Sequence, residues 1–244
     1  MTLLRSILFD LILYLSMLVL GIIFAPAALW SRDGAYRGIK VYCRWIFFVL
    51  RVLCGIRVEI RGTIPLDEVI VCSKHQSFLD IMMHAYYLPR VKFIMKNELK
   101  WAPVIGAYAM RIGSAPVRRG QKSAAMKSMV DKVSAESGDK GQLVIYPQGT
   151  RVLPGAHLTY KIGAGVLYSR SGLPCVPAAT NVGVLWARRS WYRRSGLAVV
   201  EYLPVIPAGL PIEEFMAKIE PIVEENSNRL MREAGFVGGV VSAG

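Results

Sequence analysis

The chain contains few of the residues from which metal sites and disulfide scaffolds are built. Its 244 residues include four cysteines and three histidines, and these form no Cys-x-x-Cys pair and no metal-binding spacing. Cys43, Cys54 and Cys72 lie in strongly apolar runs, and the fourth cysteine is Cys175. We therefore expect free, buried thiols in a reducing compartment and no bound metal.

Several sequence signatures of enzymes are also missing. No Gly-x-Ser-x-Gly elbow and no P-loop occurs, so the chain lacks the core motifs of serine hydrolases and nucleotide hydrolases. Lys161 and Gly163-Ala164-Gly165 begin a predicted helix, but Tyr168 stands where a dinucleotide-binding fingerprint needs its third glycine. Internal repeats and low-complexity tracts are absent as well.

Acidic residues are scarce relative to basic ones. The chain has 17 Asp and Glu against 30 Lys and Arg, which gives a formal net charge of +13. Hydrophobic residues make up 53% of the sequence, and the mean hydropathy is +0.37. Apolar bulk combined with positive charge favours a membrane surface that carries anionic lipid. Nucleic acid is the competing partner, but no nucleic-acid-binding motif occurs, so we expect none.

The N-terminal region holds the one long run without charge, residues 11–30, which follows Arg5 and Asp10. Its length reaches the roughly 18–20 residues that cross a bilayer core. A cleaved signal peptide is the alternative, although the run is longer than a usual signal core and Pro26 is unsuited to a cleavage site.

A second apolar segment, residues 41–56, carries Arg44 and Arg51 with aromatic residues between them. This pattern is typical of an interfacial helix whose arginines reach back to water. A helix packed on a globular domain is the alternative. Together the two segments predict an N-terminal helical hairpin, residues 1–56, that dips into or spans the membrane.

From residue 57 the pattern changes to alternating strands and helices. The expected strands are 57–61, 69–73, 92–95, 114–117, 142–146, 175–179 and 198–203, and the expected helices are 77–88, 103–112, 121–137, 160–171 and 211–234. This alternation predicts an α/β domain over residues 57–235, with a sheet covered by helices, and a C-terminal tail over residues 236–244. Active sites in such sheets lie at the carboxyl ends of the strands.

The most informative chemistry lies in the run from Ser73 to Asp80, Ser-Lys-His-Gln-Ser-Phe-Leu-Asp. It places His75 at a strand end and Asp80 in the first turn of a helix, where the two side chains can meet. Imidazole suits proton abstraction near neutral pH, and the carboxylate would fix its tautomer. As an alternative, Ser77 and Asp80 form a capping box, which would make Asp80 a helix cap alone.

Cationic residues gather in two further segments, Lys96 to Gly106 and Arg111 to Arg119. Arginine and lysine side chains there can grip a phosphate, although a solvated basic face is the usual explanation of such runs. Tyr146 to Arg151 predicts a tight loop in which Thr150 and Arg151 can hold an anion and backbone N–H groups can bind an oxyanion. A plain β-turn is the alternative for this loop.

These segments, in this order, resemble the bacterial PlsC-type 1-acylglycerol-3-phosphate acyltransferases. His75 and Asp80 match the HxxxxD motif of that family. The other matching positions are Lys96, Glu98, Leu99, Pro103 and Gly106 of the second block, Gly113 to Arg119 with Arg119 at the substrate-binding arginine, Tyr146 to Arg151 against Phe-Pro-Glu-Gly-Thr-Arg, and Val176-Pro177 of the fourth block. The resemblance covers roughly residues 68 to 181, and ordered blocks are far more specific than any one of them.

The chain departs from that family at two positions. Lys74 stands where the family often has Asn, and Gln148 replaces the common Glu of the third block. An amide can still orient a loop or hydrogen-bond a substrate hydroxyl, so we assign Gln148 to substrate binding. Neither departure touches His75 or Asp80.

The resemblance implies a mixed, largely parallel sheet and a transfer of a fatty acyl group from a thioester to the sn-2 hydroxyl of lysophosphatidate, giving phosphatidate. His75 would act as general base, oriented by Asp80, and no nucleophile accompanies them, which favours direct transfer. The implied donor is acyl-CoA or acyl carrier protein, without any cofactor. The implied substrate-binding residues are Lys96, Arg119, Gln148, Gly149, Thr150 and Arg151.

The membrane and the donor fix the expected location. Because thioesters are made in the cytosol, we expect the catalytic domain to face the cytoplasm from the inner membrane. Residues 188–194 form a basic patch with Trp191 and Tyr192 at its centre. We expect this patch to contact lipid headgroups or a carrier protein, and a solvated loop is the alternative.

Two other functions compete with this one. The same chemistry on lyso-ornithine lipid or another lysophospholipid would leave Arg119 and Arg151 with less to bind if the acceptor had no phosphate. A non-enzymatic membrane lipid-binding or scaffold protein would account for the N-terminal helices and the charge. It would not account for an ordered His75 and Asp80.

Overall fold

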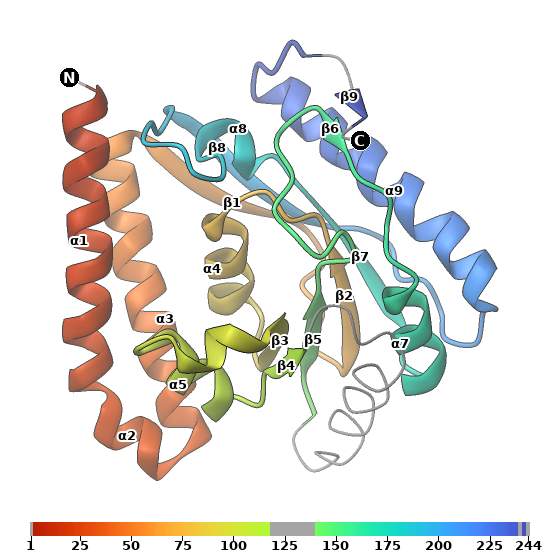
Figure 1. The fold of residues 1–244 in the computed structure, drawn as a ribbon, viewed down its shortest axis with the longest axis horizontal. Helices are drawn as coiled ribbons and strands as arrows, with labels where there is room; N and C mark the ends of the chain where they lie inside the picture. Colours follow the sequence, from red (N-terminus) through yellow and green to blue (C-terminus); the bar gives the residue numbers. More distant parts are fainter. Residues whose placement is uncertain (1, 118–139, 239–240, 243–244) are drawn as a thin grey trace.

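The computed structural model describes residues 2–117, 140–238 and 241–242, and it is built around one seven-stranded sheet (Figure 1). The strand order is β1-β8-β7-β2-β5-β3-β4, and every neighbouring pair is parallel except β7 and β8. The strands are β1 (Ile56–Gly62), β2 (Val69–Ser73), β3 (Val91–Lys96), β4 (Ala115–Val117), β5 (Gln142–Ile145), β7 (Cys175–Thr180) and β8 (Gly196–Tyr202). The predicted mixed, largely parallel sheet is therefore confirmed.

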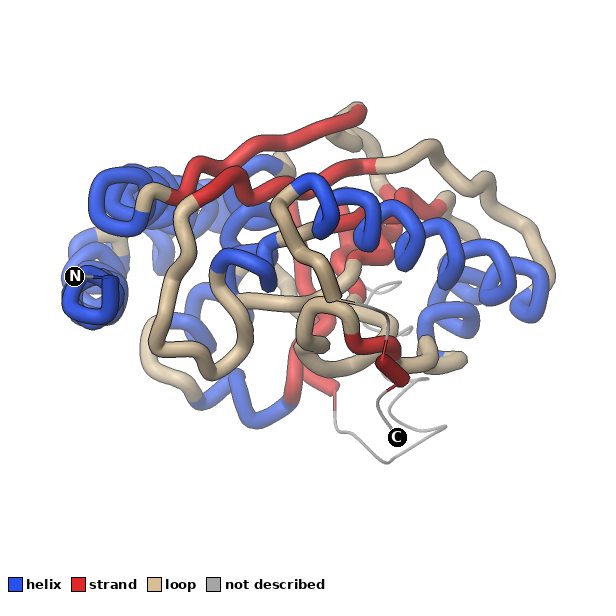
Figure 2. The backbone as a smooth tube through the Cα atoms, turned by 90° about the horizontal axis from the view of Figure 1, so that it is seen from above, coloured by secondary structure: helices blue, strands red, loops and turns tan. Residues whose placement is uncertain are grey.

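Helices cover both faces of this sheet. They are α1 (Thr2–Ile23), α2 (Ala25–Trp30), α3 (Arg32–Val49), α4 (Phe78–Tyr87), α5 (Ile105–Arg111), α7 (Gly163–Ser171), α8 (Val182–Leu185) and α9 (Ile212–Glu233). A π-helical turn, η1 (Leu50–Cys54), a 3-10 helix, η2 (Asn97–Trp101), and a small pair of strands, β6 (Ala156–His157) and β9 (Val241–Ser242), complete the described elements. Figures 1 and 2 place α1 and α3 at one end of the molecule and α9 along the opposite side.

Strand β2 lies in the middle of the sheet, and its alternating side chains divide the core in two. Val69 and Val71 join the cluster that includes α1, α3 and α4, whereas Ile70 and Cys72 join the cluster that includes α7 and α9. All of its residues are buried, as expected for a strand of a parallel sheet covered on both faces. The carboxyl end of this strand is consequently held from both sides.

The N-terminal helices differ from the predicted segments. The charge-free run 11–30 is divided, because α1 ends at Ile23 and α2 begins with Pro26 in its first turn. Proline fits a first turn but not a helix interior, since it lacks the N–H that an interior position donates. The run 41–56 is likewise no separate helix, because α3 already begins at Arg32, after Ser31 caps it by accepting a hydrogen bond from the Gly34 N–H at 2.9 Å.

Helix α3 has one face packed on the domain and one exposed face. Tyr36, Cys43 and Ile46 are buried in the core that they share with the sheet, and the Tyr36 hydroxyl donates to the Val91 carbonyl at 3.2 Å. Arg44 and Trp45 lie on the exposed side. The alternative, a helix packed on the globular domain, is therefore correct for one face of α3.

Helix α1 is long and apolar enough to cross a membrane by length and composition, over Leu3–Ile23. Its Phe9 and Leu13 are buried against the domain, whereas the large apolar side chains Leu4, Leu11, Tyr14, Leu15, Leu18 and Ile22 are exposed. An exposed apolar stripe of this length on a helix marks a surface that contacts lipid or a partner. The chain is accordingly built for membrane association.

Candidate active site

The carboxyl end of β2 brings His75 and Asp80 together. The Nδ1 atom of His75 lies 2.8 Å from Oδ1 of Asp80, and Asp80 is fully buried while the His75 side chain is 13% exposed. The described part of the chain gives Nε2 of His75 no hydrogen-bond partner, so this nitrogen is left for a substrate. A carboxylate on Nδ1 and a reachable Nε2 form the arrangement of a general base.

Asp80 is also a helix cap, so it forms the predicted capping box and contacts His75 at the same time. Its second oxygen, Oδ2, accepts hydrogen bonds from the backbone N–H groups of Gln76 and Ser77, each at 2.8 Å. The Ser77 hydroxyl accepts from the Leu79 N–H at 3.2 Å and completes the capping box. One oxygen of the carboxylate thus holds the start of α4, and the other holds His75.

The electrostatics of this pair favour a charged carboxylate. Burial alone would raise the pKa of Asp80, but the His75 imidazole and the two backbone N–H groups lower it below its ordinary value. His84, one turn further along α4, is different, because burial lowers its pKa to about 4. His84 is hydrogen-bonded to Tyr202 and Ser73, both at 2.9 Å, and is a neutral structural residue.

Tyr146, at the end of β5, covers one face of the His75 ring. The two rings are stacked with centroids 4.0 Å apart and an angle of 20° between their planes. Burial raises the pKa of Tyr146 well above its ordinary value, and the nearby charge of Asp80 adds to the shift. The phenol therefore stays neutral and fixes the plane of the imidazole.

The loop after β5 contacts the loop that carries His75 directly. The Val152 N–H donates to the His75 carbonyl at 2.8 Å, and the Gly149 N–H closes a turn by donating to the Tyr146 carbonyl at 2.8 Å. Gly149 has a φ of +71°, a conformation that glycine adopts without strain. Thr150 and Arg151 follow, and their backbone N–H groups donate to no acceptor among the described residues.

Gln148 is buried and points away from the substrate side. Its Nε2 donates to the Leu158 carbonyl at 3.1 Å and to Glu224 at 3.3 Å, while Oε1 has no partner among the described residues. Lys74 also reaches Glu224 and forms with it a buried ion pair. The structure therefore gives Gln148 a contact with α9, and sequence reasoning had no signal that linked residues this far apart.

The remaining predicted residues lie at different depths. Lys96 ends β3 on the same edge of the sheet, is half exposed, and lies 3.6 Å from Glu98. Arg119 lies outside the described residues. Arg188, which the sequence placed only in a basic patch, donates to the Thr150 hydroxyl and to the Arg151 carbonyl, both at 3.3 Å. It thereby adds a cation beside the loop.

Arg193 of the same patch is not a surface residue. Its guanidinium is buried, is paired with Asp10 of α1, and lies 4.7 Å from the Trp186 ring centroid and 5.4 Å from the Phe9 ring centroid. The buried Arg193 therefore joins the loop between α8 and β8 to the first helix. Trp191 and Tyr192 remain exposed.

An apolar pocket of about 140 Å³ lies beside helix α4. Phe78 and Met82 of α4 form part of its wall. Most of the rest comes from α1, α3 and α5, including Leu20, Tyr42 and Tyr108. A pocket of this chemistry accepts an alkyl chain.

Comparison with known proteins identifies the family of the chain. A sequence model named Acyltransferase matches residues 55–181, more than half of the chain. The chain belongs to this acyltransferase family. The match includes His75, Asp80 and the loop after β5, and it confirms the resemblance predicted from the ordered motifs.

Two sequence relatives and one solved structure can be compared with the chain. The 1-acyl-sn-glycerol-3-phosphate acyltransferase of Pseudomonas aeruginosa is 29% identical over 92% of this chain and 95% of its own length. The human alpha enzyme of the same name is 30% identical over 67% of this chain and 60% of its own length. The crystal structure of the 1-acyl-sn-glycerophosphate acyltransferase PlsC from Thermotoga maritima shares the fold, with a TM-score of 0.77 at 19% identity, covering 94% of this chain and 97% of that one.

Proposed function

We propose that this acyltransferase moves a fatty acyl group from a thioester to the sn-2 hydroxyl of lysophosphatidate and forms phosphatidate. The observation that carries the proposal is the His75–Asp80 pair, with 2.8 Å between Nδ1 and Oδ1, in which Nε2 of the partly exposed His75 has no hydrogen-bond partner among the described residues. The Pseudomonas aeruginosa relative, which covers nearly the whole chain, is named for this reaction. No cofactor is required, because the thioester supplies the activated acyl group.

In the proposed reaction His75 is the general base. Its Nε2 takes the proton of the sn-2 hydroxyl while the hydroxyl oxygen attacks the thioester carbonyl. The tetrahedral intermediate then expels the thiolate, which recovers the proton from His75 and leaves as a thiol. Asp80 stabilises the imidazolium between these two proton transfers. The backbone N–H groups of Thr150 and Arg151 serve as oxyanion donors.

Cations around the loop after β5 bind the acceptor phosphate. Arg151 and Lys161 are exposed there, and the Lys161 ammonium lies so close to Gly149 that a Cβ at that position would be 2.9 Å from it. Arg188 contacts the same loop. We add Lys96 and Arg119 as further phosphate ligands, because arginine forks and lysine ammonium groups are the common partners of phosphate. The apolar pocket beside α4 would take one acyl chain.

We propose that α1 lies along the cytoplasmic leaflet of the inner membrane and that the catalytic domain faces the cytoplasm. In this arrangement residues 1–56 are the membrane-associated part and residues 57–235 the catalytic part. The exposed apolar stripe of α1 supports contact with lipid. The Asp10–Arg193 ion pair supports an arrangement in which the first half of α1 stays beside the domain, because separating it would leave a buried cation unpaired.

One assay tests the reaction, the acceptor and the donor. Purified protein in liposomes receives a labelled acyl group, either on CoA or on acyl carrier protein, together with lysophosphatidate or lyso-ornithine lipid. His75→Ala is the matched control. We expect phosphatidate from the wild type and none above background from His75→Ala. Transfer to lyso-ornithine lipid alone would keep the chemistry and overturn the acceptor. Equal product from wild type and His75→Ala would overturn the general base.

A further inference from the structure

The two residues that flank His75 both turn away from the substrate and reach helix α9. Lys74 is 1% exposed and pairs with Glu224. Gln76 is fully buried, donates through Nε2 to the Met231 sulfur at 3.1 Å, and accepts at Oε1 from the Gly183 N–H at 3.1 Å. Glu224 and Met231 are seven residues apart and so lie on one face of the helix. The backbone of His75 is therefore anchored on both sides to α9.

The Glu224 carboxylate also holds the loop after β5. One of its oxygens, Oε2, receives Lys74, and the other, Oε1, accepts from Gln148 Nε2 at 3.3 Å and from the Tyr160 hydroxyl at 3.1 Å. Each of these partners donates a hydrogen, so a carboxylate can accept from all of them, whereas an amide would turn its NH2 group toward a donor. One buried carboxylate thus joins the catalytic loop to the loop that carries Thr150 and Arg151.

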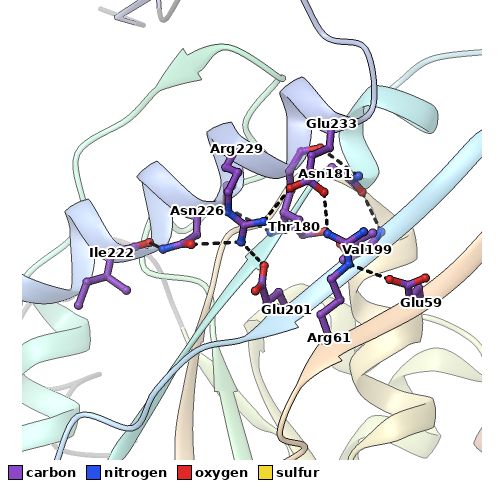
Figure 3. Close-up of polar contacts among 12 residues, drawn as sticks. Glu59, Arg61, Thr180, Asn181, Val199, Glu201, Ile222, Asn226, Arg229 and Glu233 are labelled. Carbon is purple, nitrogen blue, oxygen red and sulfur yellow. Dashed lines mark hydrogen bonds and ion pairs between the residues drawn. The ribbon is translucent and has the colours of Figure 1, made fainter.

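Helix α9 is itself fixed to the sheet, which makes Glu224 a rigid reference point. Figure 3 shows Arg229 bound to Glu201 of β8 and to Glu233 one turn along. On the buried side, the Ser227 hydroxyl accepts from the Thr180 N–H at 3.2 Å. These contacts begin one turn after Glu224 and reach the ends of β7 and β8.

We propose that Glu224 is a positioning residue for acyl transfer, an inference that rests on the proposed function. Its carboxylate sets the distance between the His75 imidazole and the backbone N–H groups of Thr150 and Arg151, which act on opposite sides of the reacting carbonyl. Misplacement of catalytic groups by about 1 Å can reduce a rate by about 100-fold. Glu224 lies beyond residue 181, where the family match ends.

The decisive experiment uses Glu224→Gln, with Glu225→Gln as its matched control. Glu225 is the next residue of α9 and is exposed, so its change removes the same charge without touching Lys74. We expect Glu224→Gln to lower kcat by about 10- to 100-fold and Glu225→Gln to leave kcat within twofold. Retention of wild-type kcat by Glu224→Gln would overturn the proposal.

A second variant separates positioning from mere stability. Lys74→Met combined with Glu224→Gln removes both buried charges, and such neutral replacements of a buried pair often fold normally. We expect its Tm to recover toward the wild type while kcat stays low, because the catalytic loop has lost the contact between Lys74 and α9 and keeps only that of Gln76 with Met231. Recovery of kcat together with Tm would show a structural role alone and overturn positioning. Failure of this double variant to fold would overturn it equally.

A measurement without substrate keeps this test distinct from the test of the reaction. The His75 Nδ1 proton that bonds Asp80 should give a low-field NMR signal in the wild type and in Glu225→Gln. We expect this signal to broaden or shift in Glu224→Gln and in the double variant. An unchanged signal would contradict positioning, whereas absence of acyl transfer by the wild type would contradict the proposed function alone.

Discussion

Replacement of Asp80 by asparagine separates the two tasks of one carboxylate. In Asp80→Asn, the amide oxygen can still accept from the Gln76 and Ser77 N–H groups, which keeps the helix cap. The NH2 group then faces His75 Nδ1 and must donate to it. That contact turns the neutral imidazole into the tautomer that carries its proton on Nε2, where it cannot act as a base.

The expected magnitudes of the two effects are far apart. Loss of the correct tautomer should lower kcat by roughly 10³–10⁴-fold, which corresponds to about 4–5 kcal/mol of transition-state stabilisation. Because the cap is kept, the free energy of unfolding at neutral pH should fall by no more than about 2 kcal/mol, the upper range for loss of a cap. Activity in liposomes and denaturant unfolding of the same sample measure both quantities.

The matched control is Ser77→Ala. It removes the hydroxyl that accepts from the Leu79 N–H but leaves the His75–Asp80 contact. We expect a loss of about 1 kcal/mol in the free energy of unfolding and a kcat within threefold of the wild type. If Asp80→Asn retains more than a tenth of the wild-type kcat, the tautomer argument is refuted.

Three further predictions follow from the site. Burial lowers the pKa of His84 to about 4, so below about pH 6.5 this residue binds a proton in the unfolded chain but not in the fold, and the free energy of unfolding should fall as the pH drops from about 6.5 toward 4. Urea unfolding at pH 7.5 and 5 should show a smaller drop for His84→Gln than for the wild type, and an equal drop would contradict this prediction. Gln148→Glu places a second carboxylate beside Glu224, and repulsion between the two raises the folded pKa of one of them. The Tm of the variant should therefore fall relative to the wild type as the pH rises above about 4.3, the ordinary pKa of Glu. Arg188→Ala should raise the KM for lysophosphatidate by about 10-fold with little change in kcat, because the loss of one charge-assisted contact costs about 1.4 kcal/mol of binding free energy. An unchanged KM would show that Arg188 has only a structural role.

The sequence predicted the centre of the fold and the contact between His75 and Asp80 because both depend on local signals. Strand β2 is a short apolar run followed by a capping box. The same local signals predicted the helices α4 and α9 within two residues at each end. His75 and Asp80 meet for a local reason, since the cap that starts α4 also orients the carboxylate.

The parts that sequence reasoning missed depend on distant partners or on a single residue. Pro26 divides the charge-free run, which a hydropathy average does not register. Lys74 can be buried because it pairs with Glu224, and no local sequence pattern predicts a partner that lies 150 residues away. Arg193 seemed to belong to a solvated patch by its neighbours, but Asp10, Phe9 and Trp186 enclose it.

The contact between Lys74 and Glu224 also bears on modularity. The match to the family model ends at residue 181, but Lys74, next to the proposed general base, forms its ion pair with Glu224, well beyond that point. A chain shortened to the recognised stretch would retain the full motif set but would carry an uncompensated charge in its interior. For this protein, the stretch that the family model matches is therefore smaller than the unit in which the buried Lys74 charge is paired. Exchange of segments between relatives should take α9 together with the HxxxxD loop.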